Sequence, residues 1–238
     1  MSLVTVTKLG SFITQTTAAI TYYVDPVLGT DAFGQGLSTG TGAFATIQYA
    51  IDSVPKYLAH NVTIQCADAT YSITTAITIA GFIGHGIFLL QGNSAAIPGT
   101  TNYVIDKASN NINAISVDRC TCQVQIIGFY IDSDVQQLAG IRINLSQYGY
   151  IQYVRSHNHS QGVLYSGSMG VVVDSDMDDN DYGVRANSAS QIRTENLSSS
   201  TINDINGLLA EGGGIRRLGT QPTGSSAATA TAQGGSIT

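Results

Sequence analysis

The chain has 238 residues, of which 43% are hydrophobic and 11% are charged, and its formal net charge is -6 at pH 7. Soluble proteins usually have about a quarter of their residues charged, so this chain must cover its surface largely with Ser, Thr, Asn and Gln. The acidic balance excludes the basic surface typical of nucleic-acid binding, and 26 glycines without any tryptophan favour a β-rich fold with many turns.

The N-terminal segment lacks the features of a targeting sequence. Residues 1–20, MSLVTVTKLGSFITQTTAAI, have neither the basic start nor the unbroken apolar core of a signal peptide. No apolar run reaches the roughly 20 residues of a membrane-spanning helix. We therefore expect residues 1–21 to be an N-terminal extension. We also expect the protein to fold in the cytoplasm and not to insert into a membrane. The odd number of cysteines favours a reducing compartment, and Cys120 and Cys122 should share the inner face of a strand.

Residues 22–60 combine a glycine-rich loop with an isolated helical pattern. Apolar residues recur at i, i+3, i+4 and i+7, which places on one face Ile47, Ala50, Ile51 and Val54. Thr46 stands where an N-cap hydroxyl is expected, and Pro55 ends the pattern because it has no N–H to donate. We expect a short amphipathic helix within residues 46–58 that covers other apolar residues.

A repeat follows further along the chain. Segments beginning at Gly140, Gly162, Gly183 and Gly207 align with one another at intervals of 22, 21 and 24 residues. Alternation within and before these segments predicts inward side chains for Ile115, Val117, Ile141, Ile143, Val163, Val184 and Leu208. The intervening Arg142 and Arg185 should then point outward.

The repeat predicts a solenoid of stacked strands. Each repeat contains two short strands and no helical pattern, so residues 61–218 are expected to form an all-β fold, a parallel β-helix. At about 22 residues and 4.8 Å per coil, this segment corresponds to about seven coils and a rod of about 34 Å. The expected helix just before the first coil has a structural purpose, because it covers one open end of the core.

The segment 219–238 has low complexity and is separated as a C-terminal tail. Alone it is expected to be disordered, because it has few residues to bury. It can also add a strand to the last coil of its own chain or of a neighbour. We expect a homotrimer joined partly through this tail.

Ionisable side chains gather in the turns before the repeated glycines. The candidate catalytic residues are Asp132, Asp134, Asp174, Asp176 and His157. Carboxylates two coils apart, about 9–10 Å, approach the spacing in an inverting glycosidase, with His157 as acid or base. The alternative interpretation is a solvated turn that collects Asp and His without chemistry.

The segment DSDMDDNDYGVR, residues 174–185, resembles a calcium-binding loop. However, Asp179 stands where the loop needs Gly, and Arg185 stands where it needs a bidentate Glu. His157 and His159 lack an evident third ligand. We therefore predict no metal site and no cofactor.

Tyrosine is the other candidate for ligand contact. Tyr148, Tyr150 and Tyr153 either form a platform on which sugar rings stack or simply occupy the surface of a sheet. Tyr165 is in phase with the inward residues, so its expected role is core packing.

The N-terminal part of the chain resembles a known family. The segments YYVDPVLGTDAFGQGLSTGTGAFATIQYAIDSV and VTIQCADATYSITTAITIAGFIGHGIFLLQGN, within residues 22–93, resemble the opening of pectate-lyase-like proteins (pectin lyase superfamily) of bacteriophage tails and prophages. The resemblance implies a right-handed parallel β-helix, a homotrimer in a tailspike, tail fibre or other virion appendage, and contact with bacterial surface polysaccharide.

The chain departs from the enzymes of that family. None of its four prolines lies in an Arg-Pro-Arg type signature, and its Gly-His-Gly at 84–86 precedes Asp178-Asp179 with no Asn-Thr-Asp. We expect first a virion structural protein, either in a tail appendage or on the head surface. It would be located in the virion, where other virion proteins would be its partners, and residues 1–21 are a candidate segment for attachment. The alternatives are a polysaccharide hydrolase or lyase and a non-catalytic carbohydrate-binding module.

Overall fold

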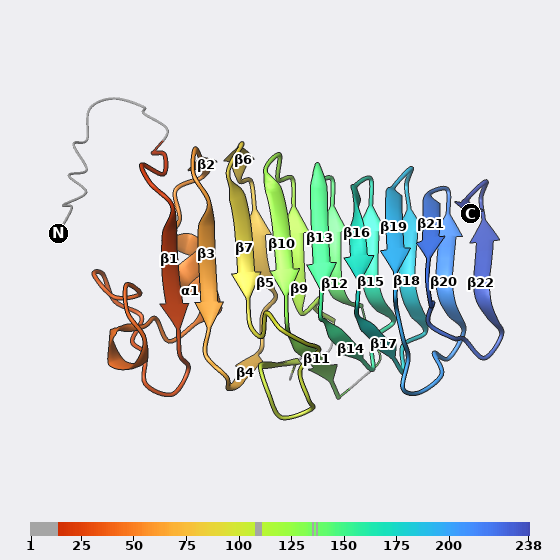
Figure 1. Ribbon diagram of the computed structural model, residues 1–238, viewed down its shortest axis with the longest axis horizontal. Helices are drawn as coiled ribbons and strands as arrows, with labels where there is room; N and C mark the ends of the chain where they lie inside the picture. Colours follow the sequence, from red (N-terminus) through yellow and green to blue (C-terminus); the bar gives the residue numbers. More distant parts are fainter. Residues whose placement is uncertain (1–13, 108–110, 135, 137) are drawn as a thin grey trace.

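The structure, a computed structural model, describes residues 14–107, 111–134, 136 and 138–238. Three long sheets of parallel strands surround one core, and the chain passes through them in turn. Figure 1 shows the strands of one sheet running down the front while those of another return behind, as the chain advances along the long axis. This path is the predicted right-handed parallel β-helix, with about seven coils of about 24 residues.

The strands of each sheet follow one another along the axis. The nine-stranded sheet contains β1 (Ile20–Val24), β3 (Val62–Cys66), β7 (Ile87–Gln91), β10 (Gln123–Ile127), β13 (Tyr148–Gln152), β16 (Met169–Val173), β19 (Gln191–Glu195), β21 (Gly214–Leu218) and β23 (Ser236–Ile237). The five-stranded sheet contains β4 (Thr70–Ile73), β8 (Val104–Lys107), β11 (Tyr130–Ser133), β14 (Arg155–His157) and β17 (Asp176–Asp178). The seven-stranded sheet contains β5 (Ile77–Ala80), β9 (Ile115–Asp118), β12 (Ala139–Asn144), β15 (Gln161–Ser166), β18 (Tyr182–Asn187), β20 (Asn206–Glu211) and β22 (Ala227–Ala232). Outside them lie η1 (Gly40–Gly42), α1 (Ile47–Asp52) and the strand pair β2 (Tyr57–Leu58) and β6 (Ile83–Gly84).

The core confirms the predicted phase of the strands. No solvent reaches the predicted inward residues Ile115, Val117, Ile141, Ile143, Val163, Val184 and Leu208. Tyr165 is also fully buried, and its hydroxyl donates to the carbonyl of Gly149 at 2.8 Å. A side chain at Gly170 would approach the Tyr165 ring to 2.5 Å, so this coil needs glycine beside its largest core residue. Cys120 and Cys122 are free and buried in the core, but they lie in the turn between β9 and β10 and not on a strand as predicted.

A stack of buried serines joins successive coils at one corner. The hydroxyl of Ser146 accepts the N–H of Cys120, that of Ser168 accepts the N–H of Ser146, and that of Ser190 accepts the N–H of Ser168. Each bond spans 3.0–3.2 Å. The stack satisfies backbone donors that would otherwise be buried without partners where the strands end.

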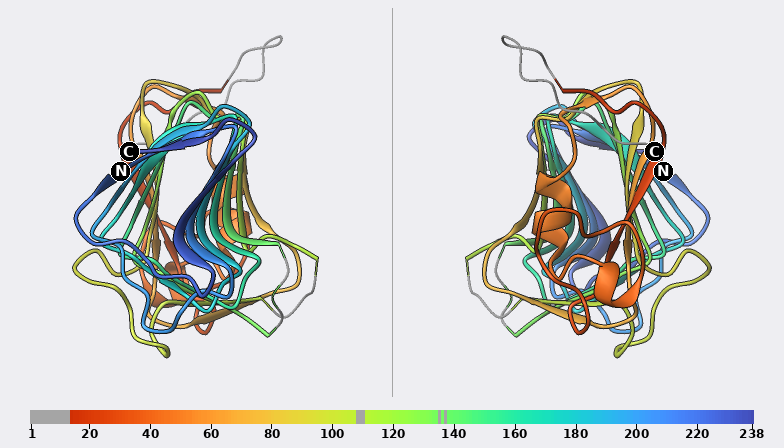
Figure 2. Two further views of the ribbon diagram at one scale, coloured as in Figure 1. Left: turned by 90° about the vertical axis from the view of Figure 1, so that its right-hand side faces the viewer. Right: turned by 90° about the vertical axis from the view of Figure 1, so that its left-hand side faces the viewer.

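The N-terminal end of the β-helix is sealed. α1 packs against β1, β3 and β5, and Figure 2 shows it across that end. Its Ile47, Ala50 and Ile51 are buried, as predicted. The amide of Gln48 accepts the N–H of Thr78 at 2.7 Å and donates to its carbonyl at 3.2 Å, so one side chain replaces a missing strand at the edge of β5.

The helix is shorter than the predicted segment 46–58. It ends at Asp52, and the chain then forms the strand β2. Thr46 is the N-cap, and its hydroxyl accepts the N–H of Tyr49 at 3.2 Å. The predicted boundary at residue 21 also moves, because β1 already pairs with β3 from Ile20 onward. Residues 1–13 of the predicted extension lie outside the described residues.

The C-terminal end is built differently. The β-helix does not stop at residue 218, because β22 pairs with β20 and β23 pairs with β21. The C-terminal segment therefore forms the last coil of its own chain, one of the two predicted strand additions, and it is not disordered. Thr229 and Thr231 stand in the inward register positions, next to Leu208 and Ala210. Among the described residues, no helix and no further strand covers this end.

Candidate functional site

The outer face of the five-stranded sheet collects most of the candidate catalytic side chains. Parallel pairing aligns Asp132 with Asp106, and His157 with Asp178, so neighbours along a row are separated by one strand spacing. Tyr130 and Arg155 are aligned in the adjacent row. The sheet thus brings residues from four successive coils onto one surface.

His157 lies between two carboxylates. Its Nδ1 is 2.8 Å from Asp132 Oδ1, and its Nε2 is 3.6 Å from Asp179 Oδ2. The hydrogen bond to Asp132 raises the pKa of His157. Burial works against the charge of Asp132, but the hydrogen bond and charge attraction to His157 outweigh burial and lower its pKa. The pair therefore favours the doubly charged form.

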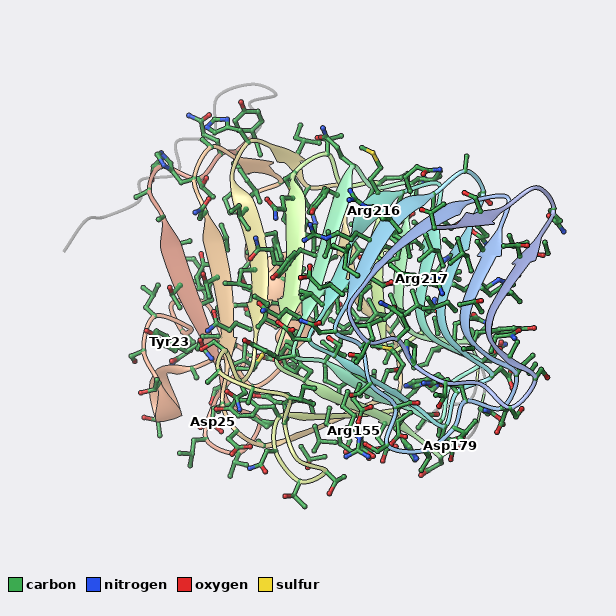
Figure 3. The ribbon with its side chains drawn as sticks, turned by 45° about the vertical axis from the view of Figure 1, so that its right-hand side comes forward. Tyr23, Asp25, Arg155, Asp179, Arg216 and Arg217 are labelled. Carbon is green, nitrogen blue, oxygen red and sulfur yellow. The ribbon has the colours of Figure 1, made fainter. Side chains whose placement is uncertain are left out.

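Arg155 joins the next two carboxylates. Its Nη2 is 2.6 Å from Asp178 Oδ2, and its Nε is 3.6 Å from Asp176 Oδ2. Asp178 is only 1% exposed and also accepts from the backbone N–H and hydroxyl of Thr201. Burial disfavours its charge, yet the bonds from Arg155 and Thr201 prevail and lower its pKa. Figure 3 labels Arg155 and Asp179 at the lower edge of the molecule.

We call this set the ionic network; it consists of Asp132, Arg155, His157, Asp176, Asp178 and Asp179. Its buried carboxylates, Asp176 and Asp178, have several partners each, because Asp176 accepts from the hydroxyls of Ser198 and Ser200 in addition to facing Arg155. Such saturated carboxylates hold a surface together but have little remaining capacity to take a proton from a substrate.

Two of the five candidate catalytic residues lie apart from the ionic network. Asp134 is exposed in the turn after β11. Asp174 lies at the corner between β16 and β17, where it accepts hydrogen bonds from Gln152 and Asn196. Sequence reasoning missed Arg155, because strict alternation through YIQYVRS gives it the same parity as the buried Ile151, and only the corner at Tyr153, with φ 53°, turns it outward.

The interior near this sheet holds two titratable groups that the sequence did not explain. His159 is fully buried, and burial lowers its pKa to about 3. Lys107 is fully buried as well, and burial lowers its pKa to about 8. Among the described residues, no group of three His, Cys, Asp or Glu side chains is arranged to hold a metal ion. The described helices include none that is long and apolar enough to cross a membrane.

The three candidate sugar-contacting tyrosines lie together on or next to the nine-stranded sheet. Tyr148 and Tyr150 point outward from β13, aligned with Gln123 and Gln125 of β10. Tyr153 follows at the corner with φ 53°. Burial raises the pKa of Tyr150, with smaller contributions from Asp174, Tyr148 and Tyr153, so these groups are electrostatic neighbours.

A groove of about 380 Å³ begins beside the ring of Tyr148. It extends over the outer face of the last coils, and its lining includes Tyr148, Met169, Gln191, Arg193, Gly214 and Arg216. We call it the Tyr148 groove. Its mixture of an aromatic ring, a thioether, an amide and guanidinium groups resembles the lining of small-molecule sites, in which apolar walls accompany a few polar groups.

Comparison with known proteins finds no family model, no curated protein and no solved structure that matches this chain.

Proposed function

We propose that this protein is a structural component of a bacteriophage virion, in a tail appendage or on the head surface, and that it contacts host-surface glycans. Two features support the proposal. The parallel β-helix fold accords with the resemblance of residues 22–93, which fold as the first strands, the glycine-rich loop, the cap helix and the first coils. The low charge of the chain suits a surface that packs against other proteins.

The observation that carries glycan contact is the position of Tyr148 and Tyr150. Both rings project from the outer face of β13, beside the amides of Gln123 and Gln125, and Tyr148 lies at the start of the Tyr148 groove. A half-buried aromatic ring offers an apolar face to a sugar ring and a hydroxyl to its polar groups. Amide side chains both donate to and accept from sugar hydroxyls.

The glycan proposal is tested by binding of the purified full-length chain to an array of bacterial capsular and lipopolysaccharide O-chain glycans. We expect binding to a subset, reduced in a Tyr148→Ala, Tyr150→Ala variant. Absence of binding to every glycan would reject glycan contact. The virion location is tested by labelling the chain during phage production and examining the purified particles by electron microscopy. If no particle contains the label, the virion location is rejected.

The competing proposal is a polysaccharide hydrolase or lyase that uses the ionic network. It is favoured by one observation, the histidine oriented by a carboxylate in the pair His157–Asp132, an arrangement used for general bases. Release of reducing ends or unsaturated sugars, lost in Asp132→Asn, would support the enzyme. Binding without cleavage would instead support a non-catalytic carbohydrate-binding module or a structural protein.

The proposal includes a homotrimer. The outer edges of β22 and β23 have no strand partner among the described residues, and an unpaired edge is a ready site for strand addition by another chain. Light scattering should give a trimer for the full-length chain and a smaller species after truncation at Gly219. A monomeric full-length chain would reject the trimer, and a truncated trimer would remove the last coil from the interface.

A further inference from the structure

Two arginines face each other in the Tyr148 groove. Arg193 of β19 is the register partner of Arg216 of β21 on the outer face of the nine-stranded sheet. Adjacent parallel strands are about 4.8 Å apart and project paired side chains to the same side. Like charges directly opposite each other destabilise a sheet, so this pair needs a reason.

Negative charge from the protein compensates only part of this pair. Arg193 Nη2 lies 3.5 Å from Glu195 Oε2, and both side chains are at least one-third exposed. Arg216 is exposed and forms no ion pair with any described residue. The groove therefore carries excess positive charge in a chain whose formal net charge is -6.

The groove also has a shaped floor. Gly214 occupies an outward position, and a Cβ there would lie 2.5 Å from Gln191 Oε1. The missing side chain lets the Gln191 amide fill the floor between the strands. Tyr148 and the 51% exposed Met169 form the wall nearest the other tyrosines. A volume of about 380 Å³ lies within the range of small-ligand pockets, roughly 300–1,000 Å³.

We propose that the Tyr148 groove binds an acidic glycan, with the carboxylate of one sugar residue held between Arg193 and Arg216 and the ring of a neighbouring sugar residue against Tyr148. Guanidinium groups form short, strong hydrogen bonds with carboxylates, and an anion between two arginines relieves their repulsion. This inference rests on the proposed glycan contact and deepens it, because it assigns the chemical class of the ligand.

The first experiment tests the anion site without a glycan. Thermal unfolding is measured in sulfate and in chloride at equal ionic strength, for the wild type, Arg216→Gln and Arg217→Gln. Arg217 is the matched control, because its register partner is the buried Thr194 and it therefore lies on the opposite side of β21 (Figure 3). We expect sulfate to raise the melting temperature of the wild type and Arg217→Gln more than that of Arg216→Gln. Equal shifts in all three proteins would overturn the anion site.

The second experiment uses the glycan array with the same proteins and with Arg193→Gln. We expect acidic glycans to bind better than neutral ones, and each substitution of Arg193 or Arg216 to weaken acidic binding about tenfold. Arg217→Gln should bind as the wild type does. Equal binding of neutral glycans, or unchanged binding in Arg216→Gln, would overturn the inference and leave glycan contact intact. A sulfate response without any glycan binding would reject the proposed function and the acidic sugar while retaining an anion site.

Discussion

The outer faces of the five-stranded and nine-stranded sheets treat charge in opposite ways. On the five-stranded sheet, Arg155 lies 2.6 Å from a carboxylate whose residue is only 1% exposed. On the nine-stranded sheet, Arg193 faces Arg216, and its one carboxylate partner is 3.5 Å away with 34% of its side chain exposed. The first face therefore uses charge to hold coils together, whereas the second leaves two arginines exposed to solvent.

The largest effect is expected from breaking the better-paired face. Asp178→Asn removes the charge that pairs with Arg155 while preserving size, and it leaves a partly buried guanidinium with only the more distant Asp176. We expect the free energy of unfolding to fall by about 2–3 kcal/mol. Urea denaturation measures this loss.

The matched control is Glu195→Gln on the other face. It removes an exposed ion pair, so we expect a change of less than about 0.5 kcal/mol. Equal losses in the two variants would contradict the assigned difference between the faces. Neither substitution should change the far-ultraviolet circular dichroism spectrum, which reports the β-strand content.

A smaller effect is expected in ligand affinity. Tyr148→Ala removes the ring at the edge of the Tyr148 groove, and we expect glycan binding to weaken by about 1 kcal/mol. Tyr148→Phe keeps the ring and should retain most of that affinity. Calorimetric titration with the tightest glycan from the array checks both values. An equal loss in both variants would assign the contribution to the hydroxyl instead of the ring.

The His157–Asp132 pair predicts a modest dependence of stability on pH. The folded pKa of His157 is raised above 6.5, so its stabilisation is complete below pH 6.5 and lost as pH rises through the folded value. The folded pKa of Asp132 is lowered below 3.8, so its stabilisation is complete above pH 3.8 and is lost as pH falls through the folded pKa. Relative to His157→Gln, the wild type should be most stable between about pH 4 and 6.5, by less than about 1 kcal/mol because both side chains are partly exposed. Chemical denaturation across pH tests this window, and a constant difference would contradict it.

The smallest effect is a gain. Burial, followed by the charges of Asp134 and Asp132, raises the pKa of Asp106, so its charged form weakens the fold above that pKa. Asp106→Asn should raise the free energy of unfolding at pH 7 by less than about 0.5 kcal/mol. The gain should vanish below pH 3.8, where the wild-type side chain is neutral in both states. A gain that persists in acid would indicate a cause other than charge.

The sequence predicted the core well because the strands alternate strictly. In each repeat the residues after the glycine are apolar at every second position, and one inward phase satisfies all of them. For the last coil the sequence leaves disorder and strand addition as alternatives, because its inward positions hold Thr229 and Thr231. Without apolar alternation, a segment rich in Ala, Thr and Gly resembles disorder although its backbone pairs with the preceding coil.

The candidate site was predicted less completely. Asp132, Asp176 and His157 gather because they occupy equivalent strands, but Asp174 is directed elsewhere by a corner with φ 47°. Spacing in the sequence does not reveal such a corner. The serine stack was within reach, because Ser146 and Ser168 both follow their repeat glycine by six residues.

The unlike ends described above give this rod a direction and a length that can be tuned. The helix α1 and the Gln48 amide close one terminus, so growth there would require rebuilding the cap. At the other terminus, each coil presents the next with a matching row of strands and with backbone N–H groups, which donate to a serine or asparagine of that next coil. Duplication of one inner coil would therefore lengthen the rod by about 4.8 Å and leave both termini unchanged. In such a rod the number of coils sets the distance between the two ends.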